Sequence, residues 1–346
     1  MKPRTALVVP TNRPDCLARF RARWEGAGWD DVVVVYDGPR GECRVEWPGA
    51  RVYCWEDYAG LCGDRSWIFT RRDSACRSFG FLRAVDRGAE VVITLDDDCY
   101  PSEPWGAGGF VPAHLERLAS APRWISSVDG LSVRGLPGEA PELRGGGPPV
   151  ALNMGLWRGV PDLAAAEALA LQRQGAGAEI LSAFLPRPGT RLVPPEQVFP
   201  LSGMNLAFRS RVLPALYFPL MGEGSPYSRF DDIWAGLLMQ RIFARSGDRI
   251  SLGEPWVTHE RASDLQECLV KEAPGVGANP RYWRVLSELG VRGGTISECA
   301  ASAARSLAGT DDTYLAQWGR ALEAWVGLCA EAAERPRGAR AALGSE

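Results

Sequence analysis

The sequence predicts an α/β protein with a Rossmann-like, mostly parallel sheet that is flanked by helices. Three short apolar runs rich in β-branched residues carry this prediction, and segments with helical spacing lie between them along the 346-residue chain. Strands that are apolar along their whole length are typical of parallel sheets covered on both faces. The composition, 46% hydrophobic and 23% charged, is that of a folded globular protein.

The first expected elements form a strand–helix–strand unit. A strand over residues 6–10 ends in the turn 11–14, and a helix follows over residues 15–24. The second strand, 32–36, is stopped by Asp37-Gly38. This order favours a βαβ arrangement and therefore a parallel pair.

The next unit repeats the pattern and ends in an acidic triplet. Residues 74–85 have helical spacing, and Asp73 or Ser74 is available as the N-cap. A third buried strand is predicted over residues 91–95, and it leads directly into the carboxylates of residues 96–98. Helix and strand alternating in this way predict a doubly wound sheet.

The rest of the chain predicts a loop, further helices and a domain division. Residues 135–149 are rich in Gly and Pro, which indicates a loop, while 233–244 and 313–334 have helical spacing with apolar stripes. We expect a main domain over residues 1–275 and a helical annex over 276–334. The tail, 335–346, is expected to fray as a flexible end.

Composition excludes several classes of protein. A net charge of −3 argues against a nucleic-acid binder, and no run is long and apolar enough for a membrane span. No early apolar run resembles a signal peptide, and nine cysteines without CxxC pairs suit free thiols, so a cytoplasmic protein is expected. With only two histidines, His114 and His259, the chain offers too few ligands of this type for a zinc site to be expected.

The acidic triplet is the main indication of chemistry. Asp96, Asp97 and Asp98 follow a buried strand, where their mutual repulsion is relieved if a divalent cation sits between them. Oxygen ligands of this kind suit Mg²⁺ or Mn²⁺, which in turn bind a substrate diphosphate. The alternative is a solvated acidic turn.

An arginine at the preceding helix start favours the diphosphate interpretation. Arg77 lies where a helix N-terminus already attracts anions, and its guanidinium can bind phosphate with two hydrogen bonds. The competing interpretations are an exposed first-turn arginine for Arg77 and a plain N-cap for Asp73.

Later polar residues are further candidates. His259 ends an apolar run and could complete a metal shell with Asp96 and Asp98, although a lone histidine is more often structural. His114, inside a helical segment, is taken as structural. Asp231 and Asp232 open a helix; they either cap it or act on sugar hydroxyls as hydrogen-bond partners or as a base.

Several segments together resemble the reversibly glycosylated polypeptide family, which includes the UDP-arabinopyranose mutases. The resemblance spans roughly residues 5–275. It is carried, in chain order, by DSACRSFG at 73–80, ITLDDDC at 93–99, GLWRGVPD at 155–162, SGMNLAF at 202–208, YFPLMGEG at 217–224 and FDDIWAG at 230–236.

The resemblance implies a GT-A-like, nucleotide-sugar-binding domain that interconverts pyranose and furanose forms of a nucleotide sugar with a divalent metal and without flavin. The missing G-x-G-x-x-G after the first strand agrees with the absence of flavin. By this resemblance Asp73, Arg77, Asp96, Asp97, Asn205 and Trp157 contact substrate, and Asp96, Asp98 and His259 bind Mn²⁺ or Mg²⁺. The family's glycosylated arginine matches Arg144, and Arg144, Asp231 and Asp232 are the expected catalytic residues.

Two departures and three interpretations follow. The family usually has histidine where this chain has Met154 and cysteine where it has Ser202, so the sugar can differ from arabinose and can be a hexose. The sequence does not decide whether the nucleotide is UDP or GDP, or whether the protein forms a homo-oligomer. Beside the mutase stand a glycosyltransferase that uses the same machinery and a non-catalytic subunit.

Overall fold

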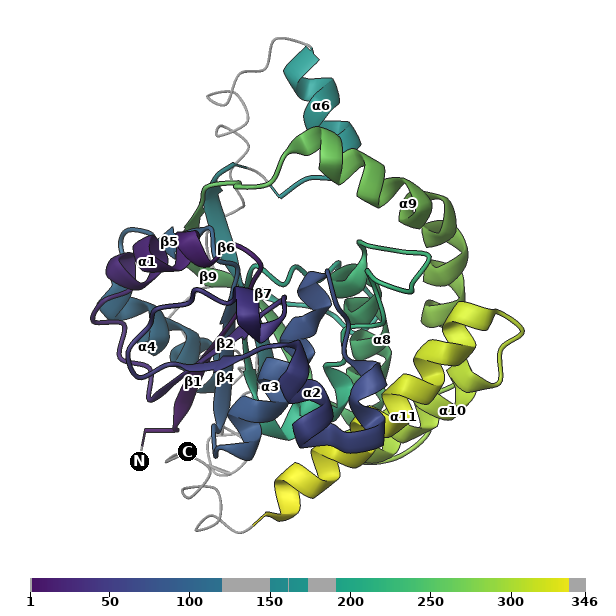
Figure 1. Ribbon diagram of the computed structural model, residues 1–346. Coiled ribbons are helices and arrows are strands. Elements are labelled where there is room, and N and C mark those ends of the chain that lie inside the picture. Colours follow the sequence, from purple (N-terminus) through teal and green to yellow (C-terminus); the bar gives the residue numbers. More distant parts are fainter. Residues whose placement is uncertain (1, 120–149, 161, 174–190, 336–346) are drawn as a thin grey trace, which may run out of the picture.

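A computed structural model describes residues 2–119, 150–160, 162–173 and 191–335 (Figure 1). In these ranges nine strands form one sheet. The strands are β1 (Thr5–Thr11), β2 (Asp31–Tyr36), β3 (Arg51–Tyr53), β4 (Val91–Leu95), β5 (Cys99–Pro101), β6 (Val150–Gly159), β7 (Arg191–Leu192), β8 (Asn205–Arg209) and β9 (Arg249–His259).

The sheet is mixed, with a parallel N-terminal half. Its order is β3-β2-β1-β4-β8-β6-β9-β5, and β7 pairs with β9. The expected parallel arrangement holds from β3 to β4 and again between β6 and β9. Strand β8 runs antiparallel to both of its neighbours, β4 and β6, and β5 and β7 run antiparallel to β9. The prediction of a mostly parallel sheet is therefore confirmed for β1 to β4 and for the β6–β9 pair, whereas β5, β7 and β8 run antiparallel to the strands they pair with.

The four helices predicted with bounds are present as α1 (Pro14–Arg23), α3 (Arg77–Asp86), α8 (Asp231–Ser246) and α11 (Thr313–Glu334). The other helices in the described ranges are α2 (Trp55–Cys62), α4 (Gly106–Ala119), α6 (Ala165–Arg173), α9 (Leu265–Glu288) and α10 (Ile296–Ala308), with short 3-10 turns η1 (Arg40–Glu42), η2 (Gly63–Ile68), η3 (Ser74–Cys76) and η4 (Ser210–Ala215). Asp73 caps η3 by accepting a hydrogen bond from the Ala75 amide at 3.0 Å, as predicted.

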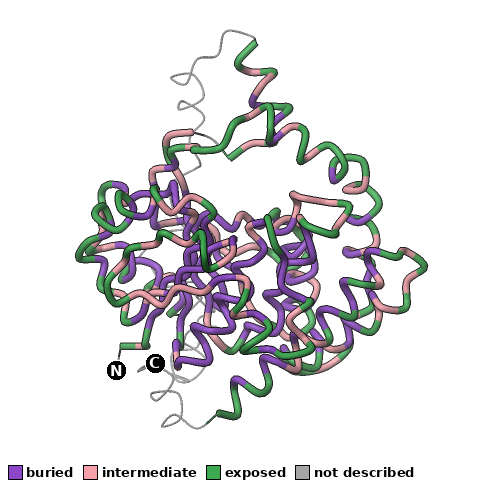
Figure 2. Tube along the Cα trace, viewed as in Figure 1, coloured by how far each residue is buried: buried purple, intermediate pink, exposed green. Residues whose placement is uncertain are grey.

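Two hydrophobic cores lie on opposite faces of the sheet. Successive strand residues point into opposite cores. Val8 and Val35 face α2, α3 and the C-terminal helices, whereas Leu7 and Val34 face α1 and α4. Both faces are covered, which explains why the strands are apolar without alternation. Figure 2 shows buried residues concentrated in the sheet and the helices beside it, with α6 and much of α9 exposed.

Helix α3 is buried on every side rather than along one stripe. All ten of its residues are buried, because the sheet covers one face and α11 packs on another. Gly80 permits the close contact with the sheet: an added Cβ would lie 2.5 Å from Val8 Cγ1 and 2.8 Å from Val35 Cγ2. The packing of α3 therefore fixes Arg77, at its first turn, relative to the strand ends.

Replacing Gly80 by alanine is expected to lower the free energy of unfolding by about 1–3 kcal/mol, since the methyl group overpacks a rigid interface. Gly60→Ala is the matched control: it lies in α2, nothing is within 4 Å of its added Cβ, and the change should stabilise by about 0.5–1 kcal/mol. Urea denaturation of both variants tests this. Equal stability of the two variants would contradict the packing described for α3.

The C-terminal helices belong to the main body. Residues of α10 and α11 lie in the same core cluster as α3 and α8, and the boundary expected between residues 275 and 276 falls inside α9. Among the described helices none is long and apolar enough to cross a membrane. The loop predicted over residues 135–149 and the tail 336–346 lie outside the described residues.

Candidate active site

The candidate site lies where β1, β4 and β9 end. Arg13 follows β1, the acidic triplet follows β4, and His259 is the last residue of β9. The carboxyl ends of strands are where open α/β sheets bind their ligands. The sequence therefore places these side chains at one edge of the sheet, and the structure brings them into contact.

Arg77 holds Asp96 in place. Its buried guanidinium donates to Asp96 Oδ1 at 2.7 Å, to the Gly203 carbonyl at 2.6 Å and to the Ser74 carbonyl at 3.1 Å. Burial alone would raise the pKa of Asp96, but the charge and hydrogen bond of Arg77 outweigh it and lower the pKa. The Asp96 side chain keeps 35% exposure, so a ligand can reach it. Contact of Arg77 with a phosphate stays a prediction.

Asp97 is buried and bound to protein partners. It accepts a hydrogen bond from Thr11 Oγ1 at 2.6 Å and forms an ion pair with Arg13. Burial raises the pKa of Asp97, and Arg13 opposes that change. In this structure Asp97 therefore holds the β1 and β4 ends together, and the substrate contact predicted for it stays a prediction. Arg13 was missed at the sequence level, although the turn after β1 could have indicated it.

Asp98 and His259 face each other as a pair. His259 Nε2 lies 3.9 Å from Asp98 Oδ1, and both residues are largely buried. His259 Nδ1 donates to the Val160 carbonyl at 2.8 Å. The Nε2 lone pair therefore faces the space between His259 and Asp98. The other Asp98 oxygen, Oδ2, accepts from the Ala262 amide at 3.0 Å. A histidine whose second nitrogen is bound to a carbonyl is the usual arrangement of a metal ligand.

The three predicted metal ligands do not converge as one set. Among the described residues no group of three or more His, Cys, Asp or Glu side chains is arranged to hold a metal ion. Asp96 turns to Arg77, whereas Asp98 and His259 remain as a two-residue site. Two protein ligands fit Mg²⁺ or Mn²⁺, which retain several waters and bind substrate phosphates.

A second acidic group lies at the start of α8. Phe230 precedes it with a φ of +81°, a left-handed conformation that costs about 1–3 kcal/mol for a non-glycine residue. Directly after it, Asp231 Oδ2 accepts from Ser74 Oγ at 3.2 Å, and Asp232 Oδ2 accepts from the Gly203 amide at 3.0 Å. The two carboxylates are thus held by Ser74 and Gly203, the residues whose carbonyls also bind Arg77.

Burial raises the carboxyl pKa values of this group. Burial, followed by the charges of Asp231 and Asp162, raises the pKa of Asp232 to about 8. Burial also raises the pKa of Asp231 and, with the Asp231 charge, that of Asp73. A carboxyl that titrates near neutral pH can both donate and accept a proton.

Asp73 and Trp157 do not lie freely in the site. Asp73 is buried as the cap of η3, and Trp157, near the end of β6, packs part of its ring against the core on the α1 side. Their predicted contacts with substrate stay predictions. Arg144, the expected glycosylated arginine, lies outside the described residues.

Asn205 is placed differently from its prediction. It is only 2% exposed, and its amide is used fully by His114, the Leu156 carbonyl and the Pro255 carbonyl, each at 3.0 Å. This geometry does not support the direct substrate contact predicted for Asn205, because its side-chain amide is buried and already bonded to protein groups.

The two departures from the family pattern touch each other. The Ser202 amide lies 3.3 Å from Met154 Sδ, and Ser202 Oγ donates to Asp162 Oδ2 at 2.8 Å. Asp162 was not predicted as a site residue, yet its charge acts on Asp232. The structure therefore adds Asp162 and Ser202 to the rim of the site.

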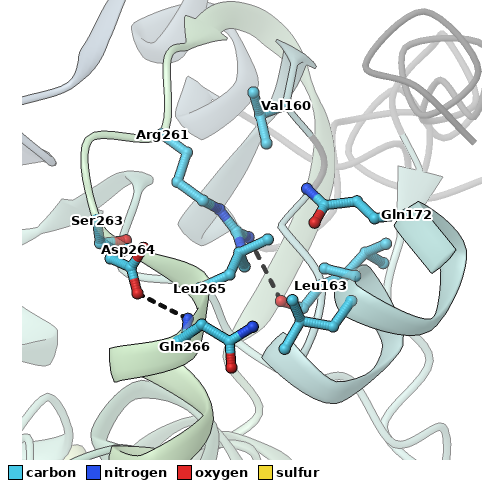
Figure 3. Close-up of a pocket in the computed structure, with 10 residues that line it drawn as sticks. Val160, Leu163, Gln172, Arg261, Ser263, Asp264, Leu265 and Gln266 are labelled. Atoms are coloured by element: carbon cyan, nitrogen blue, oxygen red, sulfur yellow. Dashed lines mark hydrogen bonds between the residues drawn. The ribbon is translucent and has the colours of Figure 1, made fainter.

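A cavity of about 420 Å³ adjoins the Asp98–His259 pair between α6 and the start of α9. Val160, whose carbonyl holds His259, lines it, and Figure 3 shows Arg261 reaching toward Leu163, whose carbonyl it contacts at 3.4 Å. The other lining residues are Ala168, Leu169, Gln172, Ser263, Asp264, Leu265 and Gln266.

The sequence matches the family model described as reversibly glycosylated polypeptide over residues 4–333. The chain belongs to this family. A probable UDP-arabinopyranose mutase 1 of Pisum sativum is 29% identical over 94% of this chain and 90% of its own length. UDP-arabinopyranose mutase 1 of Oryza sativa subsp. japonica is 29% identical with the same coverage, and a probable UDP-arabinopyranose mutase 4 of Arabidopsis thaliana is 32% identical over 78% of this chain and 73% of its own.

Membership in the reversibly glycosylated polypeptide family agrees with the resemblance found in the sequence motifs. It extends that resemblance, which ended near residue 275, through α10 and almost to the end of α11. The mixed sheet flanked by helices is consistent with the expected GT-A-like fold.

Proposed function

We propose that this protein is a metal-dependent, flavin-independent mutase that interconverts the pyranose and furanose forms of a nucleotide-diphosphate sugar. The observation that carries this proposal is the Asp98–His259 pair, which lies beside the Arg77–Asp96 ion pair. Because His259 Nδ1 donates to the Val160 carbonyl, His259 Nε2 has a free lone pair for a metal ion. The names of the relatives, UDP-arabinopyranose mutases, support the same reaction. Nine free thiols suit a cytoplasmic enzyme.

Asp98 and His259 would hold the divalent cation. When bound, Mn²⁺ or Mg²⁺ neutralises the diphosphate, which makes it a better leaving group. Arg77 keeps Asp96 ionised, and Arg13 keeps Asp97 in place, so both carboxylates stay at the strand end. These residues bind and orient; they do not themselves form bonds to the sugar.

Ring contraction requires balanced bond changes at C1. The C1–O bond to the diphosphate breaks and its electron pair leaves with the diphosphate. A nucleophile gives one proton to solvent and bonds to C1; its lone pair then forms a double bond to C1 as the C1–O5 bond opens and O5 takes a proton. O4 loses a proton as it bonds to C1, and a diphosphate oxygen returns to C1 as the nucleophile leaves and regains its own proton from solvent. One proton therefore moves from O4 to O5, and Asp232, assisted by Asp231, is suited to give and retake it.

Arg144 is the proposed nucleophile. A guanidinium is protonated at almost any pH, so the covalent step demands an unusual environment. We expect Arg144→Lys and Arg144→Ala each to abolish turnover while leaving Mn²⁺ binding unchanged. Retention of wild-type turnover by either variant, measured with the substrate identified below, would remove the covalent step and leave the rest of the proposal standing.

The deciding experiment incubates the purified protein with Mn²⁺ and a panel of UDP- and GDP-pyranoses, including hexoses, and separates the products. A new nucleotide sugar of unchanged mass, absent with EDTA and with Asp98→Ala, would establish the mutase and identify sugar and base. Asp15→Ala, at an exposed position of α1, is the matched control and should keep activity. Release of free UDP or GDP that rises with added acceptors would instead identify a glycosyltransferase. No conversion of any donor would favour a non-catalytic subunit.

A further inference from the structure

The buried Asn205 amide joins three strands. Its Nδ2 donates to the carbonyls of Leu156 on β6 and Pro255 on β9, both at 3.0 Å. Its Oδ1 must then accept, so the His114 Nε2 at 3.0 Å carries the proton. His114 Nδ1 is left to accept from Asn153 Nδ2, also at 3.0 Å. The pKa of His114 is lowered by burial to about 3, in agreement with this neutral ring.

These bonds lie at an irregularity in the pairing of β6 with β9. Met154 pairs with Leu252, yet Leu156 pairs with Trp256, so one residue of β6 stands opposite three residues of β9. The extra residues form a bulge, which bends a strand and re-aims the side chains beyond it. Gly155 leaves room for this amide clamp, since an added Cβ would lie 2.1 Å from Asn205 Nδ2 and 2.6 Å from the Pro255 carbonyl.

The register beyond the bulge determines the Asp98–His259 pair. Gly159 pairs with His259, the Val160 amide donates to the His259 carbonyl at 3.1 Å, and His259 Nδ1 donates back to the Val160 carbonyl. A slip of either strand separates Val160 from His259. The imidazole of His259 would then lose the hydrogen bond that keeps its proton on Nδ1 and leaves Nε2 unprotonated.

We propose that Asn205 is a positioning residue that locks the β6–β9 bulge, and through it the register and tautomer of His259. In this role it acts through His259 and touches neither substrate nor metal. The proposal rests on the proposed function insofar as His259 serves as a metal ligand, but the tautomer is a property of the protein alone and can be observed without turnover.

The two histidines make this testable, because they are the only ones in the chain and the structure gives them opposite tautomers. In ¹⁵N-histidine-labelled protein at pH 8, above the ordinary imidazole pKa of about 6.5, long-range ¹H–¹⁵N spectra should show one Nε2–H ring, His114, and one Nδ1–H ring, His259. Observation of both rings in the Nε2–H form in the wild type would overturn the proposal at once.

Two variants then remove the clamp in different ways. Asn205→Asp keeps an acceptor for His114 but loses the amide donor, and Gly155→Ala displaces that donor sterically. Both should turn His259 into a mixture of tautomers and weaken Mn²⁺ binding, measured by calorimetry, about tenfold. Ser251→Ala is the matched control, since it removes a buried hydrogen bond of 2.6 Å to Asn153 in the same network, while the Asn153 amide keeps its own bond to the Glu254 carbonyl and Asn205 keeps both of its bonds.

The outcomes separate positioning from function. A His259 ring that stays in the Nδ1–H form in both folded variants, or that changes equally in Ser251→Ala, would overturn the role of Asn205. A tautomer change confined to the two clamp variants supports it. If that change occurs but the wild-type protein converts no nucleotide sugar, the positioning role stands and the proposed function fails.

Discussion

Replacing Asp232 by asparagine is expected to lower turnover about 10²- to 10⁴-fold, the range of a lost general acid–base group. Its pKa of about 8 leaves the carboxyl protonated at neutral pH, ready to give a proton to O5 and to recover one from O4. The wild-type kcat/KM should fall above about pH 8, where the free enzyme loses this proton. The variant should show no such limb.

The same substitution should stabilise the fold at alkaline pH. Because the folded-state pKa lies above that of an unfolded aspartate, about 3.9, the stability contributed by the carboxyl is fully present below about pH 4 and is lost as pH rises to about 8. An asparagine side chain at this position carries no charge, so Asp232→Asn should gain about 2 kcal/mol at pH 9, reduced from the full shift because the side chain is only partly buried.

Urea denaturation at pH 5 and pH 9, together with pH–rate profiles, checks both effects. Asp57→Asn, which also changes an aspartate near a helix start but on α2 outside the site, is the matched control. It should leave the pH–rate profile unchanged. A variant at Asp232 that keeps the alkaline limb and near-normal turnover would exclude Asp232 as the proton carrier.

Local patterns predicted the elements well because they depend on residues close in sequence. The strand 91–95 and the helix 313–334 were predicted with the bounds that the structure gives them. A continuous apolar run and an apolar stripe with helical spacing are both visible in the sequence itself. The helical spacing of residues 74–85 did not show that α3 is buried on every side, since a helix between the sheet and α11 is covered all round. Helix α11, which covers α3, lies more than 200 residues later in the chain, so local patterns around residues 74–85 do not reveal this contact.

The sequence predicted that the strand-end side chains lie close together, but not which of them pair. The strand-end rule located Asp98 and His259, and the structure adds that Val160 fixes the tautomer. Arg13 and Asp162 were missed because their roles arise only when β1 and β6 end beside the triplet and α8. Asn205 was assigned to substrate from its motif, but a motif does not tell whether an amide faces a ligand or two backbone carbonyls.

Arg77→Met is expected to be the most destabilising change at the site, by about 3 kcal/mol. The methionine can fill the apolar part of the volume, but the carbonyls of Gly203 and Ser74 lose their donor, and Asp96 loses its counter-charge. Because Asp96 is 35% exposed, water compensates it in part, and the loss stays below that of a fully buried stranded charge.

The charge and the hydrogen-bond contributions of Arg77 separate in a mutant series. Arg77→Lys keeps the charge but cannot reach three acceptors at once, so it should fall between wild type and Arg77→Met in the midpoint of urea unfolding. Asp96→Asn alone should cost less than Arg77→Met, and the double variant should be less destabilised than the sum of the two by about 1 kcal/mol. Strict additivity would show that Arg77 stabilises the strand end through the carbonyls alone. Asp96 would then be free to turn toward a metal, and the three-ligand set predicted from the sequence would be restored as the better hypothesis.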